Sequence, residues 1–218
     1  MNTQHRSLVA PTIPVAQPDG LIKTSDLIRD VIVYFPIWED ARLGDSYQLL
    51  LTGLPIGDVK LISESELDPN LELNLTIPIE HLDEDGVYSV AYQITAYPGG
   101  GTADSNVKRI QIDRTPAGGP LLGPMLLPDH GFGMLRGKIP SYAGMEPGDL
   151  IQTVCNGMQG PTYRVQTENL TTSPIEISFT QEFLEGLFSD RVNITYHVTD
   201  RAGNRSILAQ SVEITMQR

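Results

Sequence analysis

Three consecutive acids, Asp83, Glu84 and Asp85, form a cluster of side chains that could bind a cation. They directly precede Gly86, so the stretch has the composition of a turn. Calcium prefers several oxygen ligands at about 2.3–2.6 Å, which clustered carboxylates and carbonyls supply. The pattern allows a calcium site at Asp83 and Asp85, and the alternative is a solvated turn.

Two aromatic side chains could bind a ligand by stacking. Trp38 and Tyr142 each follow a proline by two residues, at Pro36 and Pro140, and they are 104 residues apart. Aromatic rings at the edge of a β-sandwich can stack on sugars. The alternative is that both rings pack in the core or against a loop, because their position repeats together with its surroundings.

No set of residues predicts catalysis, and we expect the protein not to be an enzyme. The histidines are not spaced as metal ligands with one another or with a cysteine. No nucleophile elbow, phosphate-binding loop or dinucleotide fingerprint is present. Cys155 is the only cysteine, and the pattern around it predicts a buried core residue. The four histidines are His5, His81, His130 and His197.

The charge of the chain argues against two classes of partner. The net charge is −12, and no cluster of basic residues is present. Nucleic acids and anionic membrane surfaces are bound through clustered Lys and Arg, so we expect neither. No stretch approaches 18 consecutive apolar residues, which predicts no membrane insertion. The first residues lack the apolar core of a classical signal peptide.

The stretch Tyr196–Ser206 predicts a strand, a tight turn and the start of a return strand. Tyr196 alternates with polar neighbours, as in a half-buried strand. Asp200 can accept hydrogen bonds from turn N–H groups, and Gly203 suits the positive φ of a tight hairpin. The same alternation directs His197 away from Tyr196, which predicts a position on the outer face of the sheet.

The second half of the sequence repeats the first at a constant offset of 104 residues. The matches fall on turn glycines, on prolines and on the alternating apolar positions of several stretches. A constant offset at so many separate positions predicts that the sequence contains two copies of one domain. Examples are Pro36 and Pro140, Gly44 and Gly148, Gln48 and Gln152, Gly53 and Gly157, Leu73 and Ile177, and Tyr92 and Tyr196.

Short alternating stretches separated by turn residues are typical of an all-β protein, here two tandem immunoglobulin-like β-sandwich domains. We expect domain 1 over residues 1–114, with a lead-in over about residues 1–10, and domain 2 over residues 115–218. Tyr88 at the head of a strand predicts a tyrosine corner, in which the phenol bonds back to a nearby loop. Val192 stands at the matching position of the second copy, so no such corner is expected there.

The stretch Tyr196–Ser206 resembles the F–G hairpin of bacterial Ig-like repeat domains. Ile112–Pro116 resembles the Asp-x-Thr-x-Pro junctions between such repeats in large surface proteins and adhesins. The resemblance covers about residues 10–218, although the first copy has Pro98–Gly101 in place of the Asp-x-Ala-Gly-Asn turn. Related repeats sometimes hold calcium between domains, so the resemblance adds Asp113 and Asp200 as candidate calcium ligands.

The resemblance implies a non-catalytic structural or adhesive module that acts as a spacer or stalk in a bacterial surface or secreted protein, with neighbouring Ig-like repeats as partners. The alternative is a self-contained binding module for a carbohydrate or protein ligand, using Trp38 and the loop Gly99–Ser105, or an accessory domain of a secreted toxin or effector. Beyond calcium, no cofactor is expected. The expected location is the cell surface, or outside the cell by a route without a classical signal peptide, and a cytoplasmic location stays open.

Overall fold

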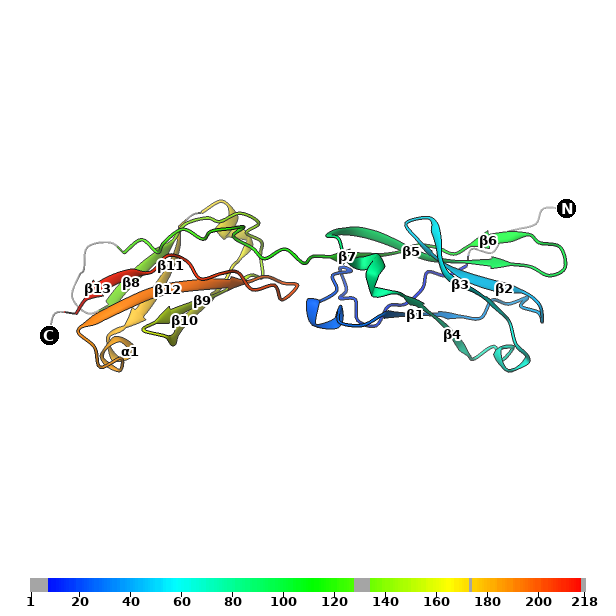
Figure 1. Cartoon of the computed structure of the whole chain (residues 1–218), viewed down its shortest axis with the longest axis horizontal. Coiled ribbons are helices and arrows are strands. Elements are labelled where there is room, and N and C mark those ends of the chain that lie inside the picture. The colour runs from blue at the N-terminus through cyan, green and yellow to red at the C-terminus, as the bar shows by residue number, and fades with distance from the viewer. Residues whose placement is uncertain (1–7, 128–133, 173, 217–218) are drawn as a thin grey trace. The chain divides into compact units, whose positions relative to one another are not determined.

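The computed structural model describes residues 8–127, 134–172 and 174–216. Contacts divide the chain into two compact units, unit 1 (Met1–Arg114) and unit 2 (Thr115–Arg218). Each unit is built from antiparallel strands, so the predicted all-β class with two β-sandwiches is confirmed (Figure 1). No helix in the described residues has the length and apolar character needed to cross a membrane.

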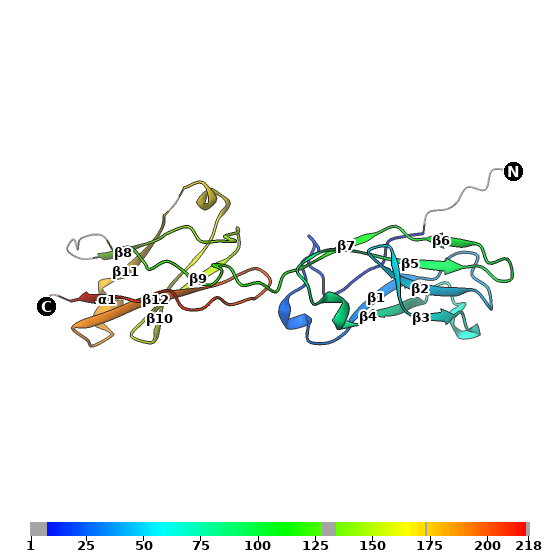
Figure 2. The ribbon, with the colours of Figure 1, turned by 45° about the horizontal axis from the view of Figure 1, so that its top comes forward.

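Unit 1 places a five-stranded sheet against the pair β1–β4 (Figures 1 and 2). The large sheet has the order β3-β2-β5-β6, and β7 also pairs with β5. A short 3-10 helix at Thr24–Asp26 precedes β1, and two more, at Glu64–Glu66 and Ile79–Leu82, lie between strands. The strands are β1 (Val31–Pro36), β2 (Ser46–Leu51), β3 (Leu54–Leu61), β4 (Glu72–Ile77), β5 (Gly86–Thr95), β6 (Thr102–Asp104) and β7 (Lys108–Ile112).

Unit 2 repeats this arrangement with a four-stranded sheet in the order β10-β9-β12-β13 and the pair β11–β8. A 3-10 helix spans Thr167–Leu170, and the short helix α1 (Gln181–Glu185) follows β11. The strands are β8 (Met134–Ile139), β9 (Leu150–Cys155), β10 (Met158–Arg164), β11 (Ile175–Thr180), β12 (Arg191–Thr199) and β13 (Val212–Thr215). Strands β2 and β9 begin 104 residues apart, which is the offset of the sequence repeat.

Alternation of apolar and polar residues builds a separate core in each unit. In β4 every second side chain is buried, because successive side chains of a strand point to opposite faces. Phe35 stacks on Tyr92 with ring centroids 4.0 Å apart and meets Tyr47 edge-on at 5.7 Å. Cys155 is fully buried in the core of unit 2, as its sequence pattern predicts.

The tyrosine corner and the F–G hairpin are confirmed. The Tyr88 hydroxyl donates a hydrogen bond to the Glu84 carbonyl at 2.9 Å, whereas the matching Val192 is buried in the core of unit 2. Asp200 Oδ1 accepts hydrogen bonds from the backbone N–H groups of Gly203 and Asn204 at 2.8 and 2.9 Å. These bonds satisfy turn donors that would otherwise depend on water.

His197 lies on the face opposite to Tyr196, as predicted, but it is covered and not open to solvent. His197 is only 6% exposed, although its neighbours Tyr196 and Val198 fill the core on the other side of the strand. The Arg205 guanidinium donates a hydrogen bond to His197 Nδ1 at 3.3 Å from the returning arm of the hairpin. Burial and the charge of Arg205 both lower the pKa of His197, which favours the neutral ring.

Sequence patterns also missed the edge strands β3 and β10. Each follows its neighbour through a two-residue turn in which both residues have positive φ: 51° and 79° at Thr52 and Gly53, and 48° and 81° at Asn156 and Gly157. Such turns match the twist of a hairpin and favour Asn-Gly.

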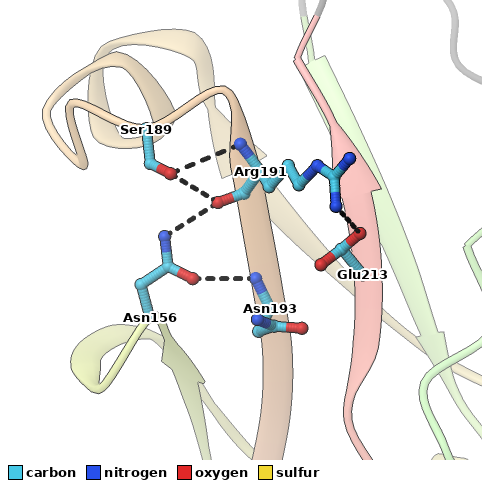
Figure 3. A network of polar contacts seen from close by, with 5 residues as sticks. All are labelled: Asn156, Ser189, Arg191, Asn193 and Glu213. Atoms are coloured by element: carbon cyan, nitrogen blue, oxygen red, sulfur yellow. Dashed lines mark hydrogen bonds and ion pairs between the residues drawn. The ribbon is translucent and has the colours of Figure 1, made fainter.

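The side chain of Asn156 also pairs with the start of β12 (Figure 3). Asn156 Nδ2 donates to the Arg191 carbonyl, and Oδ1 accepts from the Asn193 N–H. Arg191 in turn forms an ion pair with Glu213 at 3.6 Å, and Ser189 bonds to its backbone (Figure 3). These exposed contacts fix the first residues of β12, and no reactive group is among them.

Candidate functional site

In unit 1 the loop of residues 38–45 and the hairpin of residues 96–101 are joined by one buried carboxylate. We call these two segments the loop pair of unit 1. Asp45 is 3% exposed. Its carboxylate accepts hydrogen bonds from the N–H of Arg42 at 3.0 Å and from the N–H of Tyr97 at 2.8 Å. A carboxylate removed from water needs such donors, and these two fix the two segments to each other.

The exposed aromatic residue of this loop pair is Tyr97, whereas Trp38 is half-buried. Trp38 packs against the core, and its ring is edge-on to Tyr47 with centroids 6.3 Å apart. Tyr97 is 64% exposed. Its ring lies against Gly44, where an added Cβ would be 2.9 Å from Tyr97 Cδ1. Gly44 has φ +91°, so both its backbone and the ring above it require a glycine.

The loop pair of unit 2, residues 142–149 and 200–204, uses the same framework with a different carboxylate environment. Asp149 is 1% exposed. Its Oδ2 accepts from the Tyr142 hydroxyl at 2.9 Å and from the Glu146 N–H at 3.1 Å. Its Oδ1 is buried and has no hydrogen-bond partner in the described part of the chain. The Tyr142 hydroxyl is therefore used within the loop pair, as a hydrogen-bond donor to Asp149.

Burial is the main reason that the pKa of Asp149 is raised. The negative charges of Asp200 and Glu146 act in the same direction, and the two hydrogen bonds act against it. The pKa of Tyr142 is raised by burial and by the adjacent carboxylate of Asp149, so the phenol keeps its proton. The site favours a protonated Asp149 relative to a carboxyl group in water.

Arg201 occupies in unit 2 the place that Tyr97 occupies in unit 1. A Cβ added at Gly148 would be 2.9 Å from both Cγ and Cδ of Arg201. Gly148 also has positive φ, at +103°. Both units thus support one side chain of the facing hairpin on a glycine, but only unit 1 presents an aromatic ring there.

The candidate calcium ligands are placed in two separate units. In unit 1, Asp83 and Asp85 are exposed, and Asp85 Oδ1 accepts a hydrogen bond from the N–H of Arg114, the residue after Asp113. In unit 2, Asp200 Oδ1 and Oδ2 accept three hydrogen bonds within their own hairpin. Among the described residues, no three or more His, Cys, Asp or Glu side chains are arranged to hold a metal ion.

His81, His197 and Cys155, the candidates within the described residues, do not form a catalytic group. His81 is exposed in the 3-10 helix Ile79–Leu82, and His197 is buried beside Arg205. His5 and His130 lie outside the described residues. Burial raises the pKa of the Cys155 thiol to about 11, which makes it a poor nucleophile near neutral pH.

Sequence reasoning missed Asp45, Asp149 and Tyr97 as functional candidates. The repeated Gly-Asp dipeptide at 44–45 and 148–149 could have indicated the carboxylates, because both copies keep it within a loop. Tyr97 could have been found by asking where the two copies differ, since the matching residue is Arg201.

Comparison with known proteins identifies the fold and no sequence family. No family model matches the sequence, and no curated protein matches it. Two solved bacterial structures match 96% of the chain with TM-scores of 0.50. One is a Ca²⁺-stabilised adhesin with which an Antarctic bacterium binds ice, at 16% identity. The other is from a 1.5-MDa bacterial ice-binding adhesin, at 14% identity. The chain spans 48% and 64% of these two structures.

Proposed function

We propose that this chain is a non-catalytic structural and adhesive module, a spacer or stalk within a bacterial surface or secreted protein. Two observations support the proposal: one sandwich framework occurs twice, and its fold is that of adhesin domains. Neighbouring Ig-like repeats are the partners that such a module would have. A spacer must resist tension along the chain, and the pairing at the two ends of unit 1 is suited to that task.

The first and last segments of unit 1 are paired in parallel, and this observation carries the proposal. Isolated parallel bridges join Leu8 to Ser105 and Leu21 to Gln111. The Ile22 N–H donates to the Gln111 carbonyl at 3.0 Å, and the Gln111 N–H donates to the Gly20 carbonyl at 2.8 Å. We call this four-residue contact, Gly20–Ile22 with Gln111, the terminal clamp.

Tension would load the terminal clamp in shear. Force that enters before Leu8 and leaves after Ile112 pulls two parallel segments in opposite directions. Their hydrogen bonds then bear the force together, whereas antiparallel terminal strands would separate one bond at a time. The rate of forced unfolding is governed by the unfolding barrier, so a shear contact raises the force that the unit withstands.

Gly20 makes the close approach within the clamp feasible. Its φ is +95°, and an added Cβ would lie 2.7 Å from the Arg109 carbonyl oxygen. A side chain here must displace backbone, which costs more than the positive φ alone. Gly57 offers a matched control, because its φ is +65° and nothing lies within 4 Å of an added Cβ.

Single-molecule pulling of the whole chain tests the proposal. We expect two unfolding events, with unit 1 the stronger, and Phe179→Ala in the core of unit 2 identifies the weaker one. Gly20→Ala should lower the unfolding force of unit 1, whereas Gly57→Ala should leave it close to that of the wild type. The tension-bearing role is refuted if Gly20→Ala, still folded by its tryptophan fluorescence, unfolds at the wild-type force.

Calcium binding is a second part of the proposal, at Asp83, Asp85 and Asp113 in unit 1 or at Asp200 in unit 2. It is supported by the position of these acids in turns and next to the inter-unit segment. Thermal unfolding in about 5 mM calcium and in chelator tests it. A higher unfolding temperature that Asp85→Asn or Asp200→Asn removes would support binding, and identical curves would contradict it.

A further inference from the structure

We propose that the exposed ring of Tyr97, which lies against Gly44 within the loop pair of unit 1, is a stacking platform for an uncharged saccharide. This inference is independent of the spacer role, because it concerns a ligand of the loop pair and not the response to tension. It assigns the binding role to an aromatic residue other than Trp38.

The position of the Tyr97 ring is fixed before any ligand arrives. The Tyr97 N–H is bonded to buried Asp45, and the ring rests on Gly44. The hairpin is closed by the Ala96 N–H to the Gly101 carbonyl at 2.9 Å and by the Gly100 N–H to the Ala96 carbonyl at 2.7 Å. A ring held in place loses little conformational freedom on binding, which favours affinity.

Both segments of the loop pair have exposed apolar residues or uncovered glycines. Tyr97 is 64% and Leu43 55% exposed. At Gly99, Gly100 and Gly101 an added Cβ would meet nothing within 4 Å, so no neighbouring atom covers these positions of the turn. The Gly100 N–H and the Gly101 carbonyl close the hairpin, which leaves the other backbone groups of the turn for a ligand. An aromatic face binds the C–H face of a sugar ring, and nearby backbone groups can bond to its hydroxyls.

The framework does not itself require an aromatic residue at position 97. In unit 2 the same glycine and the same hairpin position accommodate Arg201, whose methylene groups cover Gly148. Packing alone therefore accepts an aliphatic stem. The Tyr97 ring is mostly exposed to water, its contact with Gly44 is one that the stem of Arg201 makes at Gly148, and tyrosine is enriched at interfaces.

The size and charge of the patch favour a saccharide over a protein. A stable protein interface covers about 800 Å² per partner around a buried apolar centre, whereas here two exposed apolar side chains lie in loops rich in glycine. The exposed charged residues of the 38–45 loop are two acids, Glu39 and Asp40, and one base, Arg42. The loop therefore has a small acidic excess within a chain of net charge −12, which disfavours an anionic sugar and points to a neutral one.

Titration of the whole ¹⁵N-labelled chain with cellohexaose, chitohexaose, maltohexaose and mannohexaose, observed by NMR, tests the inference. We expect at least one sugar to give saturable shifts at the amides of Tyr97, Gly44 and Gly99–Gly101, with a Kd on the order of 1 mM, as a small exposed site would give. Tyr97→Phe should keep the affinity within about threefold, because the ring is retained. Tyr97→Ala should weaken it by about tenfold or more, equivalent to the loss of one stacked ring.

Tyr97→Arg is the decisive variant, because it places in unit 1 the residue that unit 2 already accommodates. It should fold normally and lose the shifts. The inference is overturned if no sugar gives saturable shifts up to about 10 mM, or if the shifts persist in Tyr97→Arg. It is also overturned if dilution without sugar moves the same amides, which would assign the patch to self-association. The pulling experiment reports on the spacer role whichever result is obtained.

Discussion

Replacing Asp45 and Asp149 separately by Asn should affect the two units very differently. The carboxylates are both almost fully buried and occupy matching positions. In Asp45 each oxygen accepts one backbone N–H, from Arg42 and from Tyr97. In Asp149 both donors, Tyr142 and Glu146, meet on Oδ2, and Oδ1 has no partner among the described residues. An asparagine has one acceptor oxygen and one NH₂ group, so it can replace the second arrangement but not the first.

The expected magnitudes follow from these bonds. In Asp45→Asn one buried N–H must face the new NH₂ group, and the other bond loses its ionic character. Hydrogen bonds to charged groups are worth about 1.5–3 kcal/mol, so unit 1 should lose about 2–4 kcal/mol of unfolding free energy. In Asp149→Asn both bonds remain, and removal of a buried charge that Asp200 and Glu146 repel offsets the cost of an NH₂ group that finds no described acceptor at the Oδ1 position. Unit 2 should stay within about 1 kcal/mol of the wild type at pH 7.

Two single-residue probes allow each unit to be followed within the intact chain. The only tryptophan, Trp38, packs against the core of unit 1, and the only cysteine, Cys155, is buried in unit 2. Urea unfolding can therefore be monitored by tryptophan fluorescence for unit 1 and by thiol labelling for unit 2. Asp45→Asn should move the fluorescence midpoint down by about 1 M or more. Equal losses in the two variants, or a larger loss in unit 2, would refute the reasoning.

Three further predictions use the same probes. First, the stability of unit 2 should rise as the pH falls from neutral through the raised pKa of Asp149 toward about 3.9, the pKa of an aspartate in the unfolded chain. The reason is that the folded state binds the proton of Asp149 more tightly than the unfolded state does. Asp149→Asn should remove this component of the pH dependence, and a pH profile unchanged by the variant would contradict the prediction. Second, Tyr88→Phe should cost unit 1 about 1 kcal/mol through loss of the bond to the Glu84 carbonyl; urea curves should show this in the fluorescence transition alone, and an equal shift in the thiol transition would argue against a local effect. Third, Cys155 in the native chain at pH 8 should react with a thiol reagent at least about a thousandfold more slowly than in urea, since opening a folded domain costs about 5 kcal/mol or more; rapid labelling would show that its site opens locally.

The sequence predicts the strands well where one face of the strand is buried and the other is exposed to solvent. Leu73 and Ile177 stand in such strands, β4 and β11, and both are buried as the alternation requires. The edge strands β3 and β10 escape the same reasoning because most of their side chains are exposed and because glycine and proline interrupt them. The alternation of apolar and polar residues along a strand is visible in the sequence only where one face of the strand is buried.

Local sequence patterns fail to predict that a strand residue is covered by a side chain from another segment of the chain. The two-residue period correctly separates His197 from Tyr196, but it contains no information about Arg205, which folds back over the histidine. In the same way, the repeat shows that Trp38 and Tyr142 are equivalent without showing how they are held. One packs edge-on against Tyr47. The other donates a hydrogen bond to a buried acid.

Comparison of the two units separates the residues that the fold requires from those that it allows to vary. Both copies retain a glycine with positive φ and a buried aspartate, at 44–45 and at 148–149, so these residues belong to the framework. The residue resting on the glycine differs, and so does the partner of the second carboxylate oxygen. The framework is satisfied by either choice, because both units keep their strands and their cores. Differences in ligand binding or in pH response between the two units should therefore be sought at Tyr97, Arg201 and the aspartates below them.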